Sequence, residues 1–269
     1  MSSEREGFTW QMGVWDRLSH LYGREIDRRF RPVVEGVMTR ASLRPGERVL
    51  DLGTGTGAVG VRAAVAVGAE GRVVGIDISR EMLTEARQTA AALDLQNVDL
   101  VEGRAEAIPA GSATFDVVLA SLSLMYAIDR AVAAREIARV LRPGGRFVAA
   151  VWADPASCDI VLFQQTAGSY APPPPVPGVG PGALANPSAF VGQLATAGIN
   201  AEIRTEVLGF DFDDFESAWK VLAGVTTAEL GPERREEAKA AVRNVMWPLG
   251  DGPRHFQNTT HFIVGHLVS

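Results

Sequence analysis

Cysteine is almost absent from this sequence, and so are long apolar runs. Cys158 is the single cysteine among 269 residues, which excludes an internal disulfide framework and a cysteine-rich metal site. No apolar stretch approaches the roughly 20 residues that a membrane span needs, and the first residues lack the basic and then apolar pattern of a secretion signal. We therefore expect a cytoplasmic protein that does not bind membranes.

A surplus of positive charge is also lacking. The formal net charge of −6 would repel a phosphate backbone, so we expect no nucleic-acid partner. The one arginine-rich stretch, residues 24–31, could meet a phosphorylated or carboxylated ligand, but it also contains Glu25 and Asp27 and is more typical of a solvated helix face. No cluster of histidine and acidic residues has metal-ligand spacing, so no metal is expected.

The central part of the chain has the alternation of an α/β fold. Short β-branched apolar runs alternate there with longer amphipathic ones, which is typical of a mostly parallel sheet with helices on both faces. Strands are predicted at 48–52, 72–76, 98–101, 116–120 and 146–152, and helices at 57–67, 79–93 and 130–141. Such sheets bind ligands at the carboxyl ends of their strands.

Segments of other character flank this region. Residues 14–40 have a helical pattern interrupted at Pro32, which predicts a helical N-terminal cap within residues 1–46 and a main domain over 47–269. Residues 171–182 are too rich in proline and glycine for a helix or strand, and a short helix should begin at 186–187 and end at Gly198. Two late strands are expected at 202–207 and 261–268. Residues 209–258 between them should form a lid with helices at 213–223 and 232–246.

A glycine-rich loop follows the first predicted strand. In residues 49–57, Gly53, Gly55 and Gly57 allow a sharp turn and the close approach of a ligand. A dinucleotide pyrophosphate would favour bare N–H groups at the helix N-terminus. The α-ammonium group of S-adenosylmethionine (SAM) would instead favour a carboxylate, and Asp51 supplies one at the strand end.

Two features are also compatible with a dinucleotide as the ligand. Residues 55–60 match the fingerprint G-x-G-x-x-G, which alone is a weak signal. Asp77, at the end of the second predicted strand, would accept hydrogen bonds from ribose hydroxyls of NAD or SAM alike. It could also merely help to cap the helix that begins near Ser79. These residues predict a nucleoside ligand without deciding which one.

The chain resembles the class I SAM-dependent methyltransferases, in particular the small-molecule branch that includes the ubiquinone and menaquinone C-methyltransferases. The Pro143-Gly144-Gly145 turn before the fifth strand favours this family over NAD-binding folds. The other motifs that carry the resemblance are residues 49–57, 77–83, 103–109, 115–118 and 136–145.

The resemblance implies a Rossmann-like, seven-stranded sheet in the order 3-2-1-4-5-7-6, with strand 7 antiparallel. It also implies a set of SAM contacts. Those expected at the methionyl part are Asp51, Gly53, Thr54, Gly55 and Gly57, with Ser121 at the amino-acid end. Those expected at the nucleoside are Asp77 on the ribose and Ile78, Met82, Ala105 and Glu106 around the adenine, while Tyr22 from the cap would cover the cofactor. Ordinary core packing is the alternative for Ile78 and Met82.

Two positions depart from the family pattern. Arg104 stands where many relatives have an aspartate near the adenine, and residues 124–126 replace the Leu-His-His of quinone-type relatives. The second departure weakens the case for a quinone precursor as acceptor. A base is optional in methyl transfer, because alignment of donor and acceptor supplies most of the rate. His20 and Tyr126 are the candidate catalytic residues, with Trp152, Asp154 and His255 as further candidates by position.

The sequence therefore predicts an enzyme that transfers a methyl group from SAM to oxygen, carbon or nitrogen of a small, fairly apolar acceptor. Aromatic residues of the predicted lid motivate the apolar acceptor, although they could equally form a lid core: Phe210, Phe212, Phe215, Trp219, Trp247 and Phe256. Three alternatives are a SAM-binding protein with a non-methylating reaction such as cyclisation, an NAD(P)-dependent oxidoreductase, and a non-catalytic binding module. A monomer or a homodimer is expected.

Overall fold

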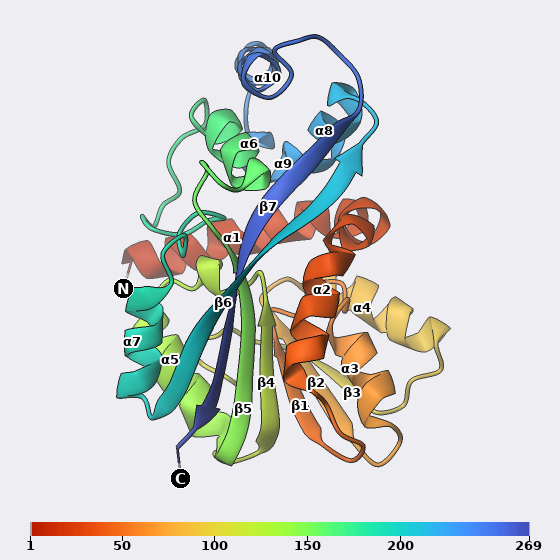
Figure 1. Cartoon of the computed structure of the whole chain (residues 1–269), viewed down its shortest axis with the longest axis vertical. Coiled ribbons are helices and arrows are strands. Elements are labelled where there is room, and N and C mark those ends of the chain that lie inside the picture. The colour runs from red at the N-terminus through yellow and green to blue at the C-terminus, as the bar shows by residue number, and fades with distance from the viewer. Residues whose placement is uncertain (1, 269) are drawn as a thin grey trace.

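A seven-stranded sheet forms the centre of the computed structural model, which describes residues 2–268 (Figure 1). Its strand order is β3-β2-β1-β4-β5-β7-β6, and β7 runs antiparallel to both β5 and β6. The predicted topology is confirmed. The strands are β1 (Arg48–Leu52), β2 (Arg72–Asp77), β3 (Val98–Glu102), β4 (Phe115–Ser121), β5 (Leu141–Trp152), β6 (Ile199–Phe212) and β7 (Arg254–Leu267).

Helices cover both faces of the sheet. α2 (Asp27–Ala41) packs across β4, β5, β6 and β7, whereas α5 (Arg130–Val140) packs against β5 and α7 (Ser188–Thr196) on the opposite side (Figure 1). α3 (Gly60–Val67) and α4 (Arg80–Ala92) follow β1 and β2 and complete the crossovers. This arrangement brings the carboxyl ends of β1, β2 and β4 to one edge, below the N-terminal helices.

The N-terminal cap breaks at a different place from the one predicted. α1 (Ser2–Leu21) is followed by a π-helical turn (Tyr22–Ile26), and α2 then continues through Pro32. Proline removes one backbone hydrogen bond from a helix. Here Val33, Val34 and Val37 are buried on the sheet, and this burial holds α2 together despite the loss. The chain therefore turns at Tyr22, which the π turn presents to the edge of the sheet.

The insertion between the last two strands is shorter than predicted. β6 extends to Phe212 and β7 begins at Arg254, so the connection spans 213–253 instead of 209–258. It contains α8 (Phe215–Leu222), α9 (Gly224–Thr227) and α10 (Pro232–Met246), which confirm the two predicted lid helices and add a short third. These helices lie above the sheet together with α6 (Asp159–Gly168), a helix that the sequence pattern did not predict (Figure 1).

Two other local predictions can be compared with the structure. Residues 171–182 form a loop, and α7 starts at Ser188, whose N–H donates to the side chain of Asn186. β5 begins at Leu141, and the Pro-Gly-Gly turn forms a bulge within it, with Gly144 at φ +73°. Among the helices of residues 2–268, none is long and apolar enough to cross a membrane.

Candidate functional site

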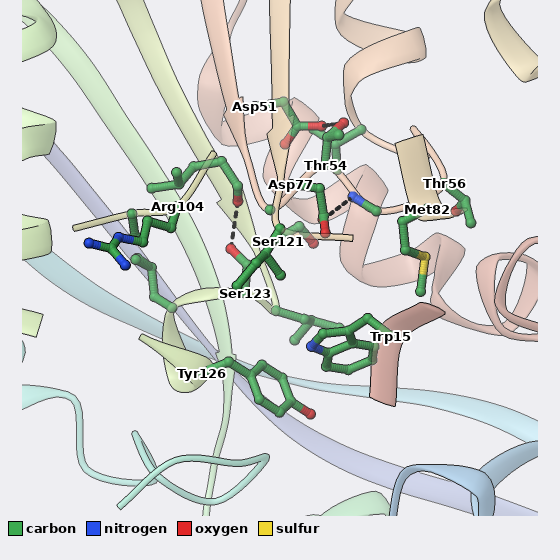
Figure 2. A pocket seen from close by; sticks show the side chains of 18 of the residues that line it. Trp15, Asp51, Thr54, Thr56, Asp77, Met82, Arg104, Ser121, Ser123 and Tyr126 are labelled. Atoms are coloured by element: carbon green, nitrogen blue, oxygen red, sulfur yellow. Dashed lines mark hydrogen bonds between the residues drawn. The ribbon is translucent and has the colours of Figure 1, made fainter. Parts of the chain in front are cut away.

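A cavity lies at the carboxyl edge of β1, β2 and β4, under α1 and the π turn (Figure 2). We call it the first cavity. It brings together every predicted cofactor residue except Gly57: Tyr22, Asp51, Gly53, Thr54, Gly55, Asp77, Ile78, Met82, Ala105, Glu106 and Ser121. Residues from the cap and from the loop after β4 complete it, including Phe8, Gln11, Trp15, Asp27, Phe30, Ser123 and Tyr126.

The glycine-rich loop turns sharply at the bottom of this cavity. Gly53 has φ +70°, and a Cβ atom added to it would lie 2.4 Å from the Cβ of Ser123. Gly55 has φ +55°, and an added Cβ would meet no atom within 4 Å, so its backbone faces open space. Gly57 also has a positive φ, but an added Cβ would lie 3.3 Å from Ala86 of α4. Gly57 therefore serves helix packing, whereas Gly53 and Gly55 shape the cavity.

Asp51 places a buried carboxylate at the end of β1. Its Oδ2 accepts a hydrogen bond of 2.7 Å from the hydroxyl of Thr54, and its carboxylate also accepts one from the N–H of Gly60. Burial raises the pKa of Asp51 to about 6. No ion pair among the described residues includes Asp51, so a ligand that brings a positive charge would relieve the cost of burying it.

The same carboxylate argues against a dinucleotide. The N–H of Gly60 opens α3, and a pyrophosphate would need this helix N-terminus. The carboxylate of Asp51 already accepts the hydrogen bond of this N–H, and its negative charge would repel a phosphate. The carboxylate fits beside Gly60 because glycine has no Cβ atom. An added Cβ would lie only 3.1 Å from Asp51 Oδ2. The third glycine of the G-x-G-x-x-G match therefore accommodates an acidic side chain instead of a nucleotide phosphate.

Asp77 places a second carboxylate on the first cavity, opposite Trp15 of the cap (Figure 2). Its two oxygens accept hydrogen bonds from the N–H groups of Gly55 and Ser79, at 2.8 and 2.9 Å. Burial raises its pKa. The side chain of Ser79, which accepts from the N–H of Met82, caps α4 itself. Asp77 thus supports the turn before α4 and also faces the cavity.

The predicted adenine side of the cavity has its own partners. Met82 is almost fully buried, and the carboxylate of Glu106 accepts hydrogen bonds from the N–H groups of Ile128 and Asp129. Arg104, where relatives have an aspartate, places its guanidinium 4.2 Å from the ring centre of Phe8 in α1. The departure from the family pattern therefore joins the cap to this side of the cavity through a cation–π contact.

The structure separates the two candidate catalytic residues. The side chain of His20 is 78% exposed, and its Nδ1 lies 2.6 Å from Glu85 Oε1. His20 is not among the described residues that line the first cavity. Tyr126 is part of the cavity wall, and its ring packs edge-on against Trp15 at 4.9 Å. Burial raises the pKa of Tyr126 and of Tyr22 above the ordinary value of tyrosine.

Asp27 lies in the wall of the first cavity, whereas the charge pattern of the sequence predicts a solvated helix face. It follows the π turn directly, and its Oδ2 accepts a hydrogen bond of 2.5 Å from the hydroxyl of Thr56. Burial raises its pKa to about 6. The helical charge pattern concealed this position, because the π turn shifts the register of the residues that follow it.

A second cavity adjoins the first. Trp15, Tyr22, Phe30, Leu122 and Tyr126 line both of them. The remaining walls of the second cavity come from the π turn, the loop after β4, β5, α6, the loop between α6 and α7, and the 213–253 connection: Ile26, Met125, Trp152, Ile160, Gln164, Pro181, Leu222 and Val225.

Three of the further predictions concern residues near this second cavity. Trp152 lines the second cavity, whereas His255 pairs with Asp211 at 2.8 Å and Asp154 is exposed. The aromatic residues of the predicted lid pack mainly against one another, for example Phe212 against Phe256 and Phe215 against Trp247. They form a core above the sheet and do not line either cavity.

Known proteins share both the sequence motifs and the fold. Residues 43–165 match a family model described as a methyltransferase domain. Over 135 residues the chain is 43% identical to nocamycin O-methyltransferase of Saccharothrix syringae, covering 49% of this chain and 48% of the relative. Over 106 residues it is 37% identical to demethylmenaquinone methyltransferase of Bacillus cereus, covering 39% and 45%. The matched segment thus spans about half the length of these relatives.

Solved structures extend the likeness in fold to most of the chain. The YcgJ protein of Bacillus subtilis superimposes with a TM-score of 0.64 at 21% identity, covering 89% of this chain and 99% of that one. The [4+2]-cyclase SpnF superimposes with a TM-score of 0.57 at 23% identity, covering 88% and 81%. The fold is therefore the Rossmann-like methyltransferase fold. Residues 43–165 are similar in sequence to methyltransferase domains.

Proposed function

We propose that the protein is an enzyme that transfers a methyl group from SAM to oxygen, carbon or nitrogen of a small, fairly apolar acceptor. One observation carries the proposal: two buried carboxylates, Asp51 and Asp77, face a cavity that continues directly into a second, mostly apolar one. The first cavity suits a polar ligand with a cation and hydroxyl donors. The second suits its reaction partner.

The residues of the first cavity fit SAM chemically. Asp51 lacks a cationic partner among the described residues and would hold the ammonium group, and Asp77 would accept from the ribose hydroxyls. Gly53 and Gly55 leave room for the methionyl part, with Thr54 and Ser121 beside them. The proposed adenine neighbours are Ile78, Met82, Ala105 and Glu106, and Tyr22 would cover the cofactor from the cap.

When bound, SAM supplies a methyl group that its sulfonium has already activated. The chain's contribution is to orient two ligands and to exclude water between them. α1 covers the meeting point of the two cavities, and the side chain of Gln11 donates a 2.8 Å hydrogen bond to the carbonyl of Tyr126. The hydroxyl of Ser79 donates to Asp16 and ties α1 to the start of α4. Two polar contacts from within α1 thus hold the cap over the first cavity.

Tyr126 is the catalytic candidate that lines both cavities. The hydroxyl of an ordinary tyrosine is protonated at neutral pH, and burial raises the pKa of Tyr126 further. Its proposed role is therefore to donate a hydrogen bond and to present an aromatic face, not to remove a proton. His20 lies outside the described walls, and we propose no contact between it and the ligands.

The wider setting is likewise part of the proposal. The net negative charge supports a small-molecule acceptor over nucleic acid. Two of the similar proteins are named as methyltransferases of nocamycin and of demethylmenaquinone, which supports a biosynthetic role for this chain. A cytoplasmic location and a monomeric or homodimeric state remain predictions.

A product assay tests the proposed function. The protein is incubated with methyl-labelled SAM and a panel of small hydroxylated, enolic and amine acceptors, and S-adenosylhomocysteine (SAH) and labelled product are measured by mass spectrometry. We expect SAH and labelled product in equal amounts with at least one neutral acceptor. Tight SAM binding with acceptor conversion but without SAH would support a non-methylating reaction. Conversion that depends on NADH instead of SAM would support an oxidoreductase.

A further inference from the structure

The walls of the second cavity restrict what it can hold. Trp15, Phe30, Tyr126 and Trp152 give it flat aromatic faces, and aliphatic side chains form most of the rest. Among the described residues that line it, none is aspartate, glutamate, lysine, arginine or histidine. A charged ligand group would lose its hydration there without gaining a partner. The space between these walls is about 460 Å³, and part of it is open to solvent.

Gln164 of α6 contributes the one side-chain amide in these walls. Only 6% of the residue is exposed. Its Nε2 donates a 2.7 Å hydrogen bond to the carbonyl oxygen of Leu222, and its Oε1 has no hydrogen-bond partner among the described residues. The contact with Leu222 fixes the orientation of the amide, because only the NH₂ group can donate to a carbonyl.

An unpartnered buried carbonyl is costly, and such groups are normally satisfied by protein, water or ligand. Gln164 is held in place by Leu222 and therefore cannot turn its oxygen to another protein group without losing that bond. Gln164 thus gives the wall a fixed carbonyl acceptor, and the walls also include the hydroxyls of Tyr22 and Tyr126. A ligand that brings one N–H or O–H donor would satisfy this carbonyl.

We propose that the second cavity binds a planar, uncharged aromatic molecule with an N–H or O–H donor, which donates to Oε1 of Gln164. The five residues that line both cavities place this molecule directly beside the first cavity. The claim that this molecule is the methyl acceptor rests on the proposed function. The claim that the second cavity binds such a molecule does not. Gln164 is a specificity-determining residue in this account, because it selects molecules that carry a donor.

A matched pair of probes tests the proposal without turnover. Indole carries one N–H donor, and 1-methylindole has the same ring system with the donor blocked. Both are titrated by calorimetry into protein saturated with SAH, which cannot transfer a methyl group. We expect indole to bind about tenfold more tightly, the order of one buried hydrogen bond. Equal affinities, or no binding of either probe at millimolar concentration, would overturn the proposal.

Two variants on the same helix assign the effect to Gln164. In Gln164→Met the side chain keeps its length but loses the acceptor, and we expect the ratio of the two affinities to fall toward one. Gln165 is the exposed neighbour, and Gln165→Met should retain the wild-type ratio. Thermal melts and SAH titrations show whether each variant is folded. A ratio unchanged in a folded Gln164→Met would refute the assignment.

The experiment also separates the two proposals. If wild-type protein does not bind SAH, the proposed function fails, and the probes are compared without it. If SAH binds while indole and 1-methylindole bind equally, only the inference about the second cavity fails. Should Gln164→Met not fold, the wild-type ratio still decides, because it needs no variant.

Discussion

Replacing Asp51 by asparagine tests the electrostatic basis of the site. Asparagine keeps the shape and can still accept from Thr54 and Gly60, but it removes the negative charge. A hydrogen bond to a charged group contributes about 1.5–3 kcal/mol, so we expect SAH to bind Asp51→Asn roughly 10- to 100-fold more weakly. Asp213→Asn, at an exposed position of the lid connection, is the matched control and should bind as wild type does.

The pH dependence of binding follows from the same carboxylate. Burial raises the pKa of Asp51 from 3.8 to about 6, and the ligand's ammonium group requires the ionised form. SAH binding by the wild type should therefore weaken about tenfold between pH 7 and pH 5. The nearby carboxylates Asp27 and Asp77 also have raised pKa values and contribute to this slope. The difference between wild type and Asp51→Asn isolates the part that belongs to Asp51.

The stability of the free protein should change in the opposite direction. Because the folded pKa is raised, the stability that the neutral form of Asp51 contributes is present below pH 3.8 and is lost as the pH rises to about 6. At pH 7.5 the ionised group lowers the free energy of unfolding by roughly 3 kcal/mol. Asp51→Asn should then raise the melting temperature while weakening the ligand. A variant that binds SAH with wild-type affinity, or a flat wild-type profile from pH 5 to 7, would refute this reasoning.

Three further substitutions address the loop and the catalytic candidates. Gly53→Ala forces a Cβ atom to within 2.4 Å of Ser123 at φ +70°, so its thermal melt should show a loss of about 1–3 kcal/mol, and SAH binding should weaken. An unchanged melt would contradict the strain. Tyr126→Phe should retain activity within about tenfold, because the buried hydroxyl is not a base; a loss above a thousandfold would restore it as one. His20→Ala should leave kcat and KM within twofold or so, as expected for an exposed side chain paired with Glu85.

The sequence predicts the site best at residues that stand at the carboxyl ends of strands. Asp51 and Asp77 end two parallel strands, and the topology brings such ends to one edge of the sheet. The alternation of strands and helices from residue 47 to 152 indicated the parallel part of the sheet. The order of the last two strands came from the family resemblance, because periodicity alone does not specify how distant strands pair.

Other features depend on packing that periodicity cannot reveal. α6 is buried on several sides and therefore lacks an amphipathic stripe, so neither the helix nor Gln164 was predicted. In the sequence Asp27 belongs to an apparent surface charge run, whereas in the structure the π turn before it places it in the wall of the first cavity. Gln164 can be identified as a binding residue only from the structure. Its NH₂ group donates to Leu222, a residue distant in sequence, and its oxygen has no partner among the described residues.

The central claim is that the first cavity binds SAM. Calorimetric titration of the purified protein with SAM, SAH and NADH, beside an Asp77→Ala variant, tests it most directly. We expect binding of SAM and SAH in the micromolar range, on the order of −8 kcal/mol, with little or none in the variant and none for NADH. A folded protein, free of co-purified cofactor, that binds neither SAM nor SAH would contradict the account.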